Sequence, residues 1–243
     1  MNNTRRIRMA ITTMLLLAVA AAGYACYSSH AVHTYLAVSV LVLAAASSRM
    51  KIKLPGINGN MSVNLPFLVT AVLNLSAAEA VFVACFSTAA QCWPSRRAKF
   101  NSQQITFNLS MMAFATAMAS VLSHANWLPA NPAPWRTSLC ITVAATTLFL
   151  GQTLPVAIIV ALSDCKKILH LWRQLAQLSL PYYVLSAGVT SMVQAVGGFL
   201  GWGLALGVFP LMYAIHLSFR LYFSRMVETA RPEILVRAAG AGS

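Results

Sequence analysis

Acidic residues are scarce in this chain: Asp and Glu together number 4 among 243 residues. Charged residues of all kinds make up 9% of the sequence, against about 25% in ordinary soluble domains. Hydrophobic residues make up 58%, which leaves too little polar surface to cover a water-soluble globule. These proportions exclude a soluble enzyme, a disordered tail and a coiled coil, and they predict an integral membrane protein.

The residue patterns that build catalytic or metal sites are also missing. The five cysteines form no Cys-X-X-Cys pair and lie mostly inside apolar runs, where they act as small hydrophobes. His30 and His33 are three residues apart, but no cysteine or acid accompanies them in the sequence. No zinc-protease motif, phosphate loop or assignable Ser-His-Asp set is present. We therefore expect no metal site and no catalysis, and the sequence leaves any cofactor unknown.

Long apolar runs are what the sequence has in abundance, and none alternates with the period of an outer-membrane barrel. A spanning helix needs about 20 apolar residues, and backbone groups in lipid must be satisfied within their own segment, which favours helices. We expect an all-α, polytopic membrane bundle of about eight transmembrane helices over residues 1–226 and a short cytoplasmic tail at 227–243. The runs cover 9–27, 34–48, 61–75, 78–93, 103–123, 137–162, 179–196 and 200–222.

Basic residues set the expected orientation. The 17 Lys and Arg residues outnumber the acids and give a net charge of +13. With both termini in the cytoplasm, every one of them except Arg136 lies on the cytoplasmic side, as the positive-inside rule requires. This distribution predicts the bacterial cytoplasmic (inner) membrane, and it accounts for the charge without a nucleic-acid partner.

Two segments need a separate interpretation. Residues 61–93 are too long for one span and short for two, and a hairpin of short helices at 61–75 and 78–93 preserves the charge rule. At a rise of 1.5 Å per residue, the first helix of this hairpin would be only about 22 Å long.

The segment Asp164–Gln177 is predicted to form a short helix on the inner membrane surface, because one of its faces carries Ile168, Leu171, Trp172 and Leu175.

Polar side chains in the third to fifth runs are candidates for binding a small molecule. Glu79 is the one acid near a span interior, yet Ser76 three residues before it predicts a capping box. Capping and ligand contact are therefore both open for Glu79, and hydrogen bonding between helices is open for the amides. The candidate ligand-binding residues are Asn64, Asn74, Glu79, Gln104 and Asn108.

Small residues at a spacing of four indicate where helices approach closely. The pairs are Ala113 with Ala117, Gly197 with Gly201, and Gly203 with Gly207. They predict packing within the bundle, or alternatively an interface with a second copy or another subunit.

The order of short motifs along residues 50–225 resembles the multi-spanning N-terminal membrane region of bacterial HD-GYP and GGDEF signalling proteins of the acidobacterial type. The motifs include Leu-Pro-Gly-Ile-Asn at 54–58, Gln-Ile-Thr-Phe-Asn-Leu-Ser at 104–110, Leu-Pro-Tyr-Tyr at 180–183 and Arg-Leu-Tyr at 220–222. The resemblance implies a membrane bundle that communicates through its last helix. It does not extend to catalysis, because the chain contains no HD or GGDEF motif.

Three hypotheses for the function follow. The first is a non-catalytic sensory or accessory membrane module that binds a small hydrophobic or polar ligand and acts through a partner, either another membrane protein or a cytoplasmic signalling protein. The second is an auxiliary or scaffold subunit of a larger membrane complex. The third is the substrate-binding bundle of a transporter, loosely similar to the vitamin-binding subunits of energy-coupling-factor transporters.

Overall fold

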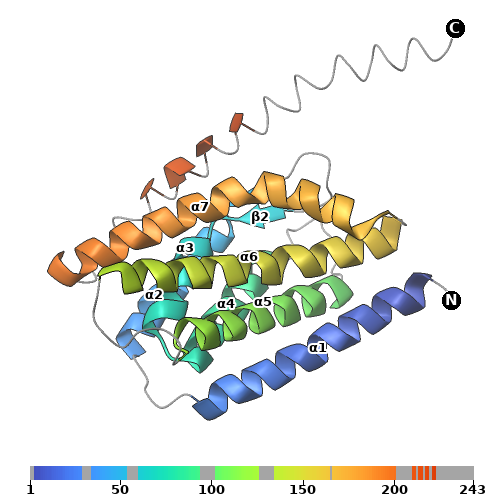
Figure 1. The fold of residues 1–243 in the computed structure, drawn as a ribbon, viewed down its shortest axis with the longest axis horizontal. Coiled ribbons are helices and arrows are strands. Elements are labelled where there is room, and N and C mark those ends of the chain that lie inside the picture. The colour runs from blue at the N-terminus through green and yellow to red at the C-terminus, as the bar shows by residue number, and fades with distance from the viewer. Residues whose placement is uncertain are drawn as a thin grey trace, which may run out of the picture.

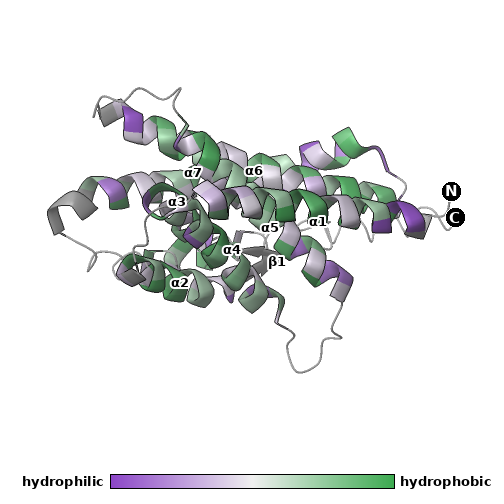
Figure 2. Cartoon of the chain, turned by 90° about the horizontal axis from the view of Figure 1, so that it is seen from below, coloured by the Kyte–Doolittle hydropathy of each residue, from purple (hydrophilic) through white to green (hydrophobic). Residues whose placement is uncertain are grey.

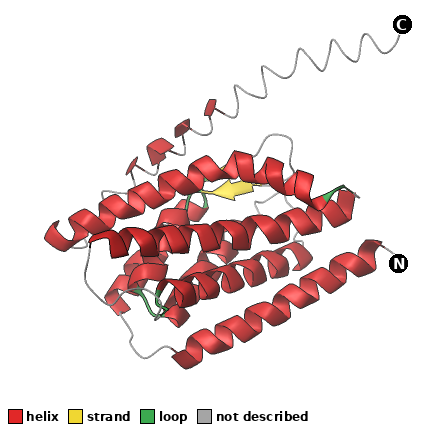
Figure 3. Cartoon of the chain, in the orientation of Figure 1, coloured by secondary structure: helices red, strands yellow, loops and turns green. Residues whose placement is uncertain are grey.

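The computed structural model describes residues 3–28, 34–53, 60–93, 102–125, 134–164, 166–200 and a few positions between 210 and 222. Up to residue 200, these ranges form a bundle of seven helices with one pair of short strands (Figures 1 and 3). The elements are α1 (Asn3–Ser28), α2 (Thr34–Ser48), β1 (Lys51–Lys53), β2 (Asn60–Ser62), α3 (Leu65–Asn74), α4 (Ala77–Cys92), α5 (Ser102–Ser123), α6 (Pro134–Asp164) and α7 (Ile168–Leu200).

The long helices pack in the order α1, α5, α6, α7, while the shorter α2, α3 and α4 gather toward one end of the bundle (Figures 1 and 2). Three described stretches are long and apolar enough to cross a membrane: Arg5–Ser28, Ser102–Ser123 and Trp135–Asp164. Figure 2 shows hydrophobic colour along the middle of the bundle and hydrophilic colour at the N-terminal end of α1. The structure therefore confirms the expected helical bundle, with three helices in the described part of the chain that are long and apolar enough to span a membrane.

The expected hairpin of short helices consists of α3 and α4, but its first helix begins later than predicted. Residues 60–62 are not helical, because they pair antiparallel with β1 in the register Lys51–Ser62, Ile52–Met61 and Lys53–Asn60. The helix begins at Leu65, with Pro66 in its first turn, where a missing N–H costs nothing. The whole stretch from Leu65 to Val72 is buried, so α3 is enclosed by its neighbours.

The N-terminal part of α7 does not form the separate surface helix predicted for Asp164–Gln177. A single helix of 33 residues continues through Pro181. Leu171 and Leu175 are buried, so this part of the apolar face packs into the bundle and not onto the membrane surface, while Ile168 remains exposed.

The small residues of α5 pack against α1. For this pair the structure therefore agrees with packing within the bundle, the first of the two predicted alternatives. Ala113 and Ala117 are buried in a cluster with Ala18 and Ala25 of α1 and Val81 of α4. Gly197 lies within α7, whereas Gly201, Gly203 and Gly207 lie outside the described residues. Short helical pieces between 210 and 222 fall in the eighth predicted run.

Helices α5 and α6 approach each other closely at Gly151. A Cβ atom built on Gly151 would lie 2.7 Å from the Cβ and 3.2 Å from the Cα of Ala115. Cys140 of α6 also donates its S–H to the carbonyl of Ser123 at 3.6 Å. These two contacts fix the antiparallel register of the helices.

We expect Gly151→Ala to lower the free energy of unfolding by about 1–3 kcal/mol, the typical cost of overpacking, because the added methyl group meets the α5 backbone. Thermal unfolding in detergent would measure it. Gly188→Ala is the matched control, since nothing lies within 4 Å of a Cβ at that helical position. Equal unfolding temperatures for the two variants would contradict the close approach.

Candidate functional site

The first turn of α3 lies against α7 in the interior of the bundle. The Leu65 amide donates to the Tyr182 hydroxyl at 3.2 Å, and the amides of Phe67 and Leu68 both donate to the Asn64 carbonyl at 3.1 Å. Pro66 has no N–H to satisfy. The orphan donors of this helix terminus are therefore used within the protein, and no open anion site remains there.

Polar side chains of α4 and α7 contact this turn. Asn64 is only 6% exposed, and its amide donates to the Ser87 hydroxyl of α4 at 3.3 Å. The Thr190 hydroxyl of α7 lies 3.4 Å from the Pro66 carbonyl and 3.0 Å from the Ser186 carbonyl. Thus the start of α3 is bonded to both α4 and α7.

A second set of polar contacts joins α6 and α7 nearby. The Tyr183 hydroxyl donates to Gln152 Oε1 at 2.7 Å, and Trp172 Nε1 donates to the Thr153 hydroxyl at 3.2 Å. The Tyr183 ring lies edge-on to Phe149 at 5.1 Å and to Tyr182 at 6.1 Å. Together these groups form what we call the polar core: Asn64, Ser87, Gln152, Thr153, Trp172, Tyr182, Tyr183 and Thr190.

Gln152, a member of the polar core, has a side-chain hydrogen-bond donor that lacks a partner in the described part of the chain. Its Oε1 accepts from Tyr183, but its Nε2 is buried and has no hydrogen-bond partner in the described part of the chain. A buried amide nitrogen without a partner is costly, and such groups in proteins call for a specific explanation. An amide nitrogen carries two N–H donors, and those of Gln152 Nε2 remain available to an acceptor.

The structure separates the residues predicted to bind a ligand. Asn64 belongs to the polar core, whereas Asn74 donates to the Thr70 carbonyl of its own helix at 2.9 Å. Glu79 forms the predicted capping box: its Oε2 accepts from the Ser76 amide at 3.0 Å and from the Ser76 hydroxyl at 2.7 Å. Asn74 and Glu79 therefore lie at the α3–α4 turn.

The two remaining candidates lie on α5. The Asn108 amide donates to Cys92 Sγ at 3.5 Å at the C-terminal end of α4, and Gln104 is exposed one turn earlier. The five candidates are thus distributed over the polar core and both ends of the α4 helix rather than around one point.

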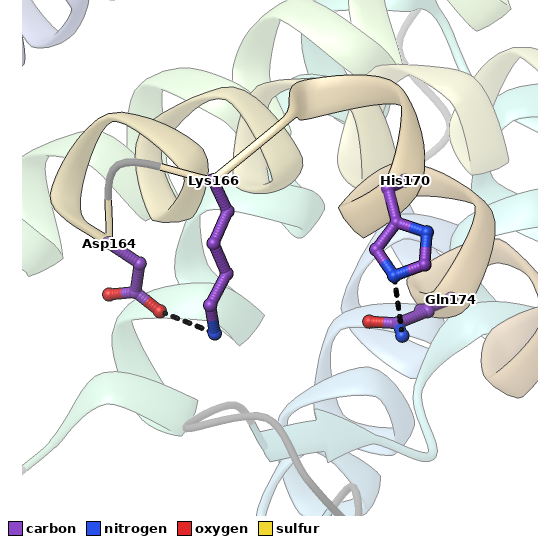
Figure 4. A network of polar contacts seen from close by, with 4 residues as sticks. All are labelled: Asp164, Lys166, His170 and Gln174. Carbon is purple, nitrogen blue, oxygen red and sulfur yellow. Dashed lines mark hydrogen bonds and ion pairs between the residues drawn. The ribbon is translucent and has the colours of Figure 1, made fainter.

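The turn between α6 and α7 carries charged and polar groups but no ligand cluster. Lys166 pairs with Asp164 at 3.4 Å, and Gln174 Nε2 lies 3.1 Å from His170 Nε2 (Figure 4). All four side chains are exposed. Among the described residues, no group of three or more His, Cys, Asp or Glu could hold a metal ion.

Gln152, Tyr182 and Tyr183 were missed as site residues in the sequence. The available signal was a polar or amphipathic residue close to a proline inside an apolar run: Gln152 is three residues before Pro155, and Tyr182 directly follows Pro181. The apolar context concealed them, because their partners are 31 and 117 residues away in the chain.

Comparison of the chain with protein-family models, curated proteins and solved structures finds no match.

We expect Tyr182→Phe to destabilise the protein by about 1–3 kcal/mol, because it leaves the buried Leu65 amide without an acceptor. Thermal unfolding in detergent is the measurement. Tyr35→Phe is the control, since the Tyr35 side chain is almost fully exposed and no such bond is lost. If both variants unfold at the wild-type temperature, the bond to α3 contributes nothing.

Proposed function

We propose that this chain is a non-catalytic integral membrane module, with about eight helices inserted in the bacterial cytoplasmic membrane and both termini in the cytoplasm. It binds a small molecule in the polar core and passes the bound state to a partner through α7. The observation that carries the ligand proposal is the buried, unpartnered Nε2 of Gln152.

The distribution of apolar side chains supports the membrane location. Large hydrophobic side chains point away from the bundle on α1 and on α7, where Leu16 is 66% exposed and Val184 and Met192 are each 64% exposed. In water such surfaces would drive aggregation, whereas acyl chains solvate them. Arg5, Arg6 and Arg8 are exposed at the N-terminal end of α1, as expected at the cytoplasmic surface.

The chemistry of the polar core supports a small ligand with a hydrogen-bond acceptor. Around Gln152 are the rings of Tyr183 and Phe149 and the hydroxyl of Tyr183. Small-molecule sites combine apolar and aromatic walls with a few polar groups in this way. A carbonyl or ring nitrogen on the ligand would satisfy the amide donors of Gln152.

The hydrogen bonds of α7 suggest how a bound state would be transmitted. Tyr183 contacts Gln152, while the adjacent Tyr182 and the later Thr190 bond to the first turn of α3. A ligand that binds Gln152 Nε2 and reorients this amide would also move Tyr183, which is bonded to Oε1, and would change the position of α7 relative to α3 and α6. Since the chain continues from α7 to its C-terminal region, a partner that docks there would sense the change, as the resemblance to signalling proteins implies.

Native mass spectrometry of the chain extracted gently from its own membranes tests this proposal. We expect a bound small-molecule mass on the wild-type chain and its loss in Gln152→Leu, which keeps a similar volume but removes the donors. Gln174→Leu is the control, because Gln174 is exposed at the surface, and it should retain the mass.

Two results would contradict the proposal. A wild-type chain that carries no small molecule and leaves the membrane in a fixed ratio with other subunits would support the scaffold hypothesis instead. A bound mass that persists in Gln152→Leu would exclude the polar core as its site.

A further inference from the structure

The helices on one side of the bundle are shorter than the helix they pack against. The Asn108 amide contacts Cys92 Sγ at 3.5 Å, so α4 ends level with Asn108 of α5. Asn108 lies six residues after Ser102, where α5 begins. At 1.5 Å per residue, α4 therefore stops about 9 Å short of the N-terminal end of α5.

The opposite ends of the two helices coincide. From Cys92 back to Ala77, α4 covers about 22 Å, and α5 covers the same distance from Asn108 to Ser123. The antiparallel register is supported along their length, because Val81 packs with Ala113 and Ala117. The shortfall of α4 therefore lies entirely at the end near Ser102.

Helix α2 packs beside α4 and is equally short, about 21 Å from Thr34 to Ser48. The outward side chains of this pair are large and apolar: Val38, Val42, Phe82 and Phe86 are all exposed. Exposed aromatic residues lie at the ends of the α2–α4 pair: Tyr35 at the start of α2 and Trp93 directly after α4. Tyr and Trp are the residues that mark the level of lipid headgroups. We call this surface the α2–α4 face.

We infer that the bilayer is locally thinned around the α2–α4 face, so that headgroups of one leaflet reach Trp93, about 9 Å closer to the midplane than at Ser102. The inference rests on the membrane location proposed above. In a bilayer of full thickness, Trp93 and the end of α4 would lie in hydrocarbon, where backbone carbonyls find no water.

Acyl chains are the occupant that fits this face. Interfaces between membrane helices favour small residues, which let backbones approach. The exposed positions here carry branched and aromatic side chains, and Phe82 stacks on Phe86 at a centroid distance of 6.2 Å. Such a surface suits lipid chains rather than a second copy of this protein.

Spin-label depth measurement tests the inference. Single cysteines replace Phe86, Trp93 and Ser102 in a background where Cys92→Ser keeps a partner for Asn108 and the other cysteines are Ala. The full chain is reconstituted in vesicles of oleoyl phosphatidylcholine and phosphatidylglycerol, and accessibility to oxygen and to a nickel complex gives the depth. Only variants that elute as the wild type does are compared.

We expect the labels at positions 93 and 102 to report the same headgroup depth, while the label at 86 reports hydrocarbon. A label at 93 that is about 9 Å deeper than the label at 102 would overturn the thinning. Low accessibility to both reagents at position 86 would overturn lipid as the occupant, because it would indicate protein cover. Nickel access at 86 equal to that at 102 would instead contradict the membrane location itself.

The unmodified chain provides a second measurement that needs no substitution. Its unfolding temperature should be highest in thin bilayers and fall from myristoleoyl through oleoyl to erucoyl phosphatidylcholine. An unfolding temperature that rises with chain length, or that does not change, would overturn the inference.

Discussion

The hydrogen bond from the Leu65 amide to the Tyr182 hydroxyl is the interaction on which this architecture depends. With ten residues, α3 is about 15 Å long, so one of its ends must lie inside the bundle. A helix N-terminus in an apolar interior needs acceptors for its free backbone N–H groups, because each unsatisfied N–H is costly. The chain solves this with Pro66, which lacks the N–H, with the Asn64 carbonyl, and with a tyrosine from a helix far along the sequence.

The other features follow from placing that terminus in the core. Helix α7 has to pass close to α3, which brings Tyr183 against α6 and creates the contact with Gln152. Gly151, the residue directly before Gln152, lets α6 approach α5 closely at this position. Because α3 turns back through the Ser76–Glu79 capping box into α4, that side of the bundle is made of short helices. The proposed ligand site and the proposed thinning of the bilayer thus share one structural cause.

Local chemistry was predictable from the sequence, and distant pairing was not. The capping box of Ser76 and Glu79, the short hairpin, and the close packing at Ala113 and Ala117 all depend on spacings of three or four residues. The strand pair was missed because two three-residue strands give no periodic signal. The start of α7 was misplaced because an apolar stripe that includes Leu171 and Leu175 looks the same whether it meets lipid or protein. Gln152 was missed because its partner lies on another helix.

Hydrogen–deuterium exchange of the full chain in lipid nanodiscs tests whether α3 is a buried half-length helix whose first turn is bonded in the core. We expect peptides from Leu65–Asn74 to exchange as slowly as those from the middle of α5, because their amides are bonded and enclosed. Exchange of α3 at the rate of a solvated loop, with α5 still protected, would contradict it.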